Sequence, residues 1–166
     1  MNSETVTAYL SLGSNLGERQ ENLDKALDYL SQRMQLVKVS SVYDTEAVGN
    51  SEQPRFFNLI CQLSTRLAPE ELLMVAKGIE RKMGRQPGKV NAPRPIDIDI
   101  LFYGNEVINT KELVIPHPRL TERAFVLVPL VEIAPKLMHP ISDKTVKELL
   151  GELKKGLQGI LRLENS

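Results

Sequence analysis

The stretch that decides the fold is Arg94-Pro95-Ile96-Asp97-Ile98-Asp99-Ile100-Leu101-Phe102, in which aspartate alternates with isoleucine. Alternation of apolar and polar residues predicts a β-strand with one buried face. The isoleucines then face a core, and Asp97 and Asp99 point together to the opposite side of the sheet. Two positions apart on one strand face is about 6.5 to 7 Å between Cα atoms.

Two like charges at that spacing repel each other unless something positive lies between them. A hard divalent cation would remove the repulsion, because carboxylate oxygen is the ligand that such ions prefer. The alternative is two solvated aspartates on a wet sheet face, and the spacing by itself slightly favours it. Arg94 and the neighbouring proline-rich loop favour the metal site instead, since cations beside a carboxylate pair suit a site that binds metal and phosphate.

The elements around this strand predict an α+β fold. Periodicity and turn residues indicate strands at 6–12, 36–43 and 56–65, helices at 18–34 and 69–83, and then the aspartate strand. This β-α-β-β-α-β order is ferredoxin-like, with an antiparallel sheet, both helices packed on one face and the other face free for a ligand. A helix over 124–134 and an amphipathic C-terminal helical segment over 145–163 follow. We expect residues 1–166 to form a single domain.

Composition narrows the function classes. Lys+Arg and Asp+Glu number 21 each in 166 residues, and this zero net charge argues against a broad nucleic-acid footprint. Cys61 is the single cysteine and lies in an apolar run, which excludes an intramolecular disulfide and a multi-cysteine metal site. The N-terminus lacks a targeting signal, and no apolar run approaches membrane-spanning length. We therefore expect a cytoplasmic protein with no membrane or nucleic-acid partner.

Three further patterns could carry chemistry. Phe56 and Asn58 share a strand face, which suits stacking on a flat heterocycle and binding its edge, although a core phenylalanine beside a backbone-bonded asparagine is favoured when this pair is taken alone. Arg85, Lys89 and Arg94 bracket a loop with three prolines and a glycine and could clamp polyphosphate oxygens. The glycine turn at 13–17 is a weak phosphate site, and an ordinary helix cap at Ser14 or Asn15 is favoured.

Several motifs occur in one order along the chain. The most specific is Ala92-Pro93-Arg94-Pro95-Ile96-Asp97-Ile98-Asp99-Ile100-Leu101, supported by Gly13-Ser14-Asn15-Leu16, Tyr43-Asp44-Thr45, Gln53-Pro54-Arg55-Phe56-Phe57-Asn58, Gly104-Asn105-Glu106-Val107-Ile108, Val114-Ile115-Pro116-His117-Pro118-Arg119 and Ile133-Ala134-Pro135. Together they resemble the 6-hydroxymethyl-7,8-dihydropterin pyrophosphokinase family of folate biosynthesis. The resemblance covers nearly the whole chain.

The resemblance implies transfer of pyrophosphate from ATP to the hydroxymethyl group of the pterin, leaving AMP. It implies two Mg²⁺ ions on Asp97 and Asp99, and catalytic roles for Asp97, Asp99, Arg85 and Arg94. The pterin would lie against Thr45, Val48, Phe56, Asn58 and Phe125. ATP would lie against Lys77, Glu80, Arg94, Leu113, His117 and Arg123. We expect a monomer whose partners are these two small molecules.

The chain departs from many relatives at four places. Asn91 stands where a tryptophan is common and Val90 where a basic residue is common, so stacking by loop 85–95 differs. Glu112 replaces an arginine and Ala47 a frequent proline. Two other functions remain as alternatives: a ferredoxin-like module that binds small molecules without turnover, and a metal-dependent enzyme acting on nucleic acid. Zero net charge weighs against the second.

Overall fold

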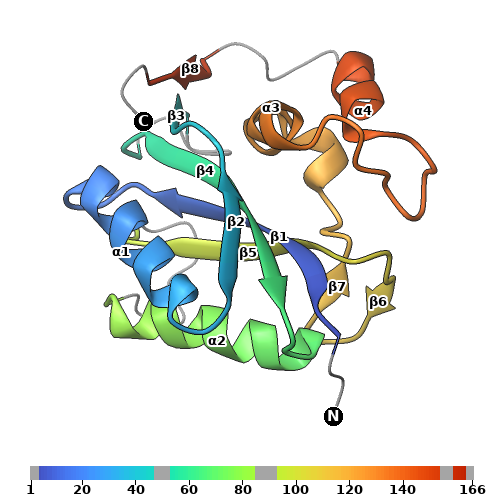
Figure 1. Cartoon of the computed structure of the whole chain (residues 1–166). Helices are drawn as coiled ribbons and strands as arrows, with labels where there is room; N and C mark the ends of the chain where they lie inside the picture. Colours follow the sequence, from blue (N-terminus) through green and yellow to red (C-terminus); the bar gives the residue numbers. More distant parts are fainter. Residues whose placement is uncertain (1–3, 47–52, 85–92, 154–158, 164–166) are drawn as a thin grey trace.

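The computed structural model describes residues 4–46, 53–84, 93–153 and 159–163 (Figure 1). The elements are β1 (Val6–Ser14), α1 (Arg19–Ser31), β2 (Gln35–Val39), β3 (Tyr43–Thr45), β4 (Phe56–Thr65), α2 (Pro69–Lys82), β5 (Asp97–Tyr103), β6 (Ile108–Asn109), β7 (Val114–Ile115), a 3₁₀ turn (Leu120–Glu122), α3 (Ala124–Ile133), α4 (Val146–Glu152) and β8 (Leu161–Arg162). No helix in these ranges is long and apolar enough to cross a membrane.

The main sheet has the strand order β5-β1-β4-β3-β8, with β2 also paired to β4. Every pairing in it is antiparallel. The strand predicted over 36–43 is in fact two strands, which pair with opposite ends of β4. Ser40 lies in the break between them: its N–H donates to the Ile60 carbonyl at 2.9 Å, and its Oγ accepts from the Ile60 N–H at 2.9 Å. A side chain thus replaces one rung of the ladder, and the chain changes direction there.

Helices lie on both faces of the sheet (Figure 1). α1 and α2 cover one face, over a core that includes Leu10, Leu12 and Ile98. The prediction that the opposite face is free was only half right, because α3 and α4 pack there against Tyr9, Leu101 and their neighbours. The reason is the pattern along one face of β5, where Asp97 and Asp99 are followed by the apolar Leu101. Helices cover the apolar half and leave the half with the aspartates open.

The helix predicted over 145–163 was wrong in its second half. α4 begins at its Thr145 cap, where Thr145 and Glu148 bond each other's backbone N–H groups, and it ends at Glu152. Gly159 has φ +77°, which no helix accommodates, and Leu161 and Arg162 pair with β3 as β8. The Leu161 side chain, predicted to be on an apolar helix face, is 61% exposed.

Candidate active site

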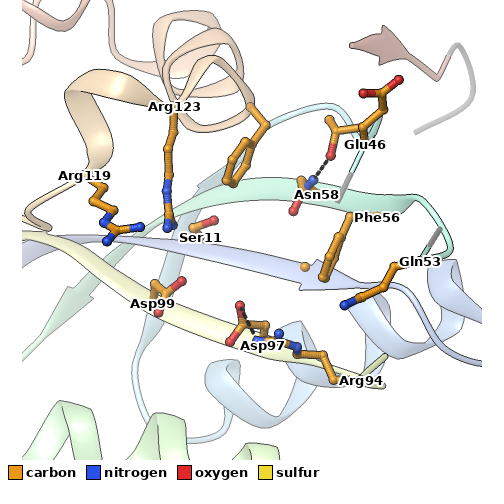
Figure 2. A pocket seen from close by; sticks show the side chains of 13 residues that line it. Ser11, Glu46, Gln53, Phe56, Asn58, Arg94, Asp97, Asp99, Arg119 and Arg123 are labelled. Carbon is orange, nitrogen blue, oxygen red and sulfur yellow. Dashed lines mark hydrogen bonds and ion pairs between the residues drawn. The ribbon is translucent and has the colours of Figure 1, made fainter. Parts of the chain in front are cut away.

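The open half of the sheet forms the floor of a cavity of about 210 Å³. Its lining residues are Ser11, Gly13, Thr45, Glu46, Gln53, Phe56, Asn58, Arg94, Asp97, Asp99, Arg119, Arg123 and Phe125. Figure 2 shows Asp99, Arg119 and Arg123 at one side and Phe56, Asn58 and Gln53 at the other, with Glu46 beside Asn58 and with Asp97 and Arg94 below Phe56 in this view. The cavity therefore has an aromatic and carboxamide side and a charged side.

Asp97 and Asp99 lie on β5 opposite Gly13 and Ser11 of β1, and both point into the cavity (Figure 2). Burial, and next the charge of Asp97, raise the pKa of Asp99 to about 6. The two carboxylates therefore lie close together, and Asp99 is largely removed from water. One Arg94 nitrogen, Nη1, lies 3.5 Å from Asp97 Oδ2, and the Arg94 guanidinium lies 6.0 Å from the centre of the Phe56 ring.

Glu80 acts beneath the strand rather than in the cavity. Its side chain on α2 is 3% exposed, and its Oε2 accepts a 2.7 Å hydrogen bond from the backbone N–H of Ile98, between the two aspartates. Lys77 Nζ lies 3.4 Å from Glu80 Oε1. A buried carboxylate that accepts a backbone N–H and faces an ammonium group fixes the position of the aspartate strand.

The other residues predicted to surround ATP divide into two groups. Arg94 and Arg123 line the cavity, whereas Lys77, Glu80, Leu113 and His117 are not among its lining residues. Leu113 is buried in the core shared with α1 and α2. The backbone N–H of His117 donates to the Leu101 carbonyl, and its Nδ1 accepts from the backbone N–H of Arg119. Burial, and next the charge of Arg123, lower the pKa of His117 to about 4.

The carboxamide side is built around Asn58, whose Nδ2 donates to Thr45 Oγ1. Both residues are buried, and Phe56 and Phe125 line the same cavity. Gly13 of β1 approaches closely: a Cβ there would be 2.7 Å from Asn58 Oδ1 and 3.2 Å from Phe56 Cδ1. Only glycine fits at this position, because any side chain would displace the amide or the ring.

Asn15 is not the helix cap that the glycine turn predicted. α1 has Glu18 at its N-cap position, with no side-chain cap bond. The Asn15 side chain instead bonds two other loops: Nδ2 donates to Gln53 Oε1 at 3.0 Å and to the Pro54 carbonyl at 3.2 Å, and Oδ1 accepts from the Arg94 N–H at 2.8 Å. Its backbone N–H also donates to the Arg94 carbonyl at 3.1 Å. Asn15 therefore ties both rims of the cavity to β1.

Two groups of residues remain: predicted site residues that lie outside the described part of the chain, and cavity-lining residues that were not assigned to the site from the sequence. Val48, Arg85 and Lys89 belong to the first group. The second group is Ser11, Gly13, Glu46, Gln53 and Arg119. Alternation along β1 could have placed the first two on the face opposite the core. The last three lie at loop positions, where no periodicity indicates orientation.

The fold and the cavity define the class of protein. It is an α+β protein with an antiparallel sheet, whose pocket sets aromatic and carboxamide groups against carboxylates and arginines. Carboxylates and arginines gathered in this way are typical of enzymes that transfer phosphoryl groups.

Comparison with known proteins gives the family. The family model described as 7,8-dihydro-6-hydroxymethylpterin-pyrophosphokinase (HPPK) matches residues 9–135. The 2-amino-4-hydroxy-6-hydroxymethyldihydropteridine pyrophosphokinase of Aquifex aeolicus is 44% identical over 147 residues, which are 89% of this chain and 92% of that protein. The Bacillus subtilis protein of the same name is 44% identical over 76% of this chain and 77% of its own length. The chain belongs to the HPPK family.

Longer proteins contain the same unit. The folic acid synthesis protein fol1 of Pneumocystis carinii is 41% identical over 86% of this chain, which spans only 20% of that protein. A crystal structure of Plasmodium falciparum HPPK-DHPS shares the fold, with a TM-score of 0.70 and 19% identity over 89% of this chain and 43% of that one. The chain is thus an enzyme, a pyrophosphokinase of folate synthesis, as the sequence motifs predicted.

Proposed function

We propose that this cavity is where the chain transfers the pyrophosphate group of ATP to 6-hydroxymethyl-7,8-dihydropterin, with AMP as the other product. The observation that carries the proposal is that one cavity joins Phe56, Asn58 and Phe125 to Asp97, Asp99 and Arg123. A flat heterocycle needs the first set and a polyphosphate needs the second. The two substrates would therefore meet at the boundary between the two sides.

On the pterin side, the rings of Phe56 and Phe125 would stack on the heterocycle. The Asn58 carboxamide would bind its edge. An amide nitrogen carries two N–H bonds, and the hydrogen bond to Thr45 uses one and sets the plane of the group. The amide is then oriented before the substrate arrives, which lowers the entropy cost of binding.

On the phosphate side, the donor chemistry fits Mg²⁺. Two carboxylates project from one strand face, and burial raises the pKa of Asp99, as does the neighbouring charge of Asp97. Among the described residues no group of three or more His, Cys, Asp or Glu side chains could hold a metal. Asp97 and Asp99 on one strand face suit Mg²⁺, which is held by one or two carboxylates together with substrate phosphates and water. Asp97 and Asp99 would hold two such ions, and bound Mg²⁺ supplies charge neutralisation on the phosphates.

The remaining roles belong to side chains of the chain itself. Arg94 and Arg123 would bind phosphate oxygens and stabilise the negative charge of the transition state. Glu80 would hold the β5 backbone so that both aspartates keep their spacing. His117, with its low pKa, would be neutral at pH 7 and act as a hydrogen-bonding group rather than a cation. Val48 and Arg85 remain predictions from the family resemblance.

We further propose that residues 1–166 form one domain of ferredoxin-like topology that acts as a monomer in the cytoplasm. The strand order, with β1 between β5 and β4 and with β2 and β3 beyond β4, supports the topology. Sedimentation of the chain at several concentrations tests the oligomeric state.

The experiment that tests the function is AMP formation from ATP and Mg²⁺, with and without 6-hydroxymethyl-7,8-dihydropterin. We expect AMP only when the pterin is present, in equal amount to pyrophosphorylated pterin. Omission of Mg²⁺ should abolish both products. If both ligands bind and no AMP forms, the cavity binds without catalysis and the proposal is wrong.

A further inference from the structure

The last described residues of the chain, 159–163, form a strap along the edge of the sheet beside β3 (Figure 1). Tyr43 pairs with Arg162 and Asp44 with Leu161 in antiparallel register. Beyond this pair, the Leu163 N–H donates to the Val42 carbonyl at 2.9 Å, and Arg162 Nε donates to Ser41 Oγ at 2.9 Å. The strap therefore lies against residues 41 to 44, through strand pairing with Tyr43 and Asp44 and through hydrogen bonds with Ser41 and Val42.

One guanidinium group joins the strap to the cavity wall. Arg55 Nε donates to Asp44 Oδ1 at 2.8 Å, and its Nη2 donates to the Asp44 carbonyl at 3.1 Å and to the Gly159 carbonyl at 2.5 Å. Its Nη1 lies 3.7 Å from Glu46 Oε1. Arg55 thus contacts β3, the strap and a cavity residue at once, and it directly precedes Phe56. Lysine could not do this, because its single ammonium group lacks the planar fork of donors.

The strand that the strap holds carries part of the cavity. β3 ends at Thr45, whose Oγ1 accepts a hydrogen bond from the Asn58 side-chain amide. The next residue, Glu46, lines the cavity. β3 has only three residues, too few to be held firmly by pairing with β4 alone. Helix α3 also holds this segment: the Glu132 carboxylate accepts hydrogen bonds from the Ser41 N–H at 2.9 Å and from the Tyr43 hydroxyl at 2.7 Å. Gly159 lies close to Glu46, since a Cβ at Gly159 would be 3.5 Å from the Glu46 carboxyl carbon.

The strap also lies beyond residue 135, where the match to the family model ends. We propose that residues 159–163 position the pterin side of the cavity, and that Arg55 is the positioning residue that couples this strap to Thr45 and Glu46. The inference rests on the proposed function, because it assigns the pterin to that side. ATP would lie at the side of Asp97 and Asp99, which are carried by β5, whereas the bonds of Arg55 and Arg162 described above go to Asp44, Gly159 and Ser41.

The test uses full-length variants that cut the two anchors of the strap separately. Arg55→Ala removes the bridge to Gly159, Arg55→Lys keeps the charge without the fork, and Arg162→Ala removes the bond to Ser41. Lys144→Ala is the matched control, because it removes a cation from the exposed 2.7 Å ion pair with Glu152. Each variant is measured for KM of the pterin, KM of ATP, kcat and Tm.

We expect Arg55→Ala to raise the KM of the pterin about tenfold, the equivalent of one lost charge-assisted contact. The KM of ATP should stay within about twofold. Arg55→Lys should recover part of the loss, Arg162→Ala should change the pterin KM in the same direction, and Lys144→Ala should match the wild type. Equal changes in both KM values, or a lower Tm with neither KM changed, would overturn the inference and leave the strap a purely structural edge.

Failure of the proposed function would look different. In that case the wild type itself would give no pterin-dependent AMP, before any variant is compared. If the wild type turns over and Arg55→Ala and Arg162→Ala show no difference between the two KM values, the function stands and the strap assignment is wrong.

Discussion

Asn15 is buried where three segments meet, and its replacement by alanine tests how far one carboxamide holds the cavity together. The side chain is 1% exposed and makes three hydrogen bonds, to Gln53, to the Pro54 carbonyl and from the Arg94 N–H. Alanine removes all three bonds. The bond from the Asn15 backbone N–H to the Arg94 carbonyl does not involve the side chain, so the variant can keep it.

The expected loss follows from these contacts. An intramolecular hydrogen bond contributes about 1 kcal/mol net, so three contribute about 3 kcal/mol. The Arg94 N–H is left in a partly buried place, and an unpaired buried donor costs about 1 to 3 kcal/mol when water cannot reach it. Asn15→Ala should therefore lower the free energy of unfolding by about 3 kcal/mol where water reaches that N–H, and by about 4 to 6 kcal/mol where it does not, a large part of the 5 to 15 kcal/mol typical of a domain.

The assay is urea unfolding followed by circular dichroism, with Asn22→Ala as the control. Asn22 lies in the first turn of α1 and also bonds through its amide, to Ser14 Oγ at 3.2 Å and to the Leu16 carbonyl at 2.8 Å, but it contacts neither cavity rim through these bonds. The second of these bonds is exposed, so water replaces it and the loss should stay below about 1 kcal/mol. If Asn15→Ala costs no more than Asn22→Ala, the side chain is not the tie that its contacts indicate.

Three further changes test separate parts of the site. Asp99→Asn keeps the shape of the side chain and removes its charge, so turnover should fall by about 100-fold or more with an unchanged circular dichroism spectrum; a normal rate would refute the role of the carboxylate pair. Asn58→Ala should weaken pterin binding by about tenfold or more in calorimetry while ATP affinity stays within about twofold, and equal losses would place Asn58 elsewhere. The low pKa of His117, about 4 in the folded protein against 6.5 for a free imidazole, means that unfolding takes up a proton between these values, so the contribution of His117 to stability falls as pH drops through this window, whereas Asp99, with its pKa raised to about 6, contributes in the opposite direction. His117→Asn should remove this contribution and leave that of His139, whose pKa burial also lowers, so the dependence of stability on pH should differ between the variant and the wild type; identical curves would show that the pKa of His117 is not lowered in the folded protein.

Local patterns in the sequence predicted most of the elements. Pro69 at the first helical position and acidic residues in the first turn indicated α2, and Gly84, with φ +96°, stops it near the predicted end. β4 matches its predicted bounds of 56 and 65. The alternation of isoleucine with aspartate set both aspartates on one face of β5. Each of these features depends on residues within a few positions of one another, where periodicity and backbone preference decide the outcome.

Only the tertiary structure decided what those elements meet. The sequence contains the side chains of Asn15, Glu80 and Arg55, but the partners that give them their roles are distant along the chain: Gln53 for Asn15, the Ile98 N–H for Glu80 and the Gly159 carbonyl for Arg55. The same holds for the tail, where helical periodicity predicted a helix and Leu161 and Arg162 pair with β3 instead. A short amphipathic segment is marginal as a helix by itself, so an unpaired strand edge can determine its conformation. Sequence determined which residues could bind a metal, a phosphate or a ring; the folded sheet decided which of them lie in one cavity, because long-range approach leaves no local signal.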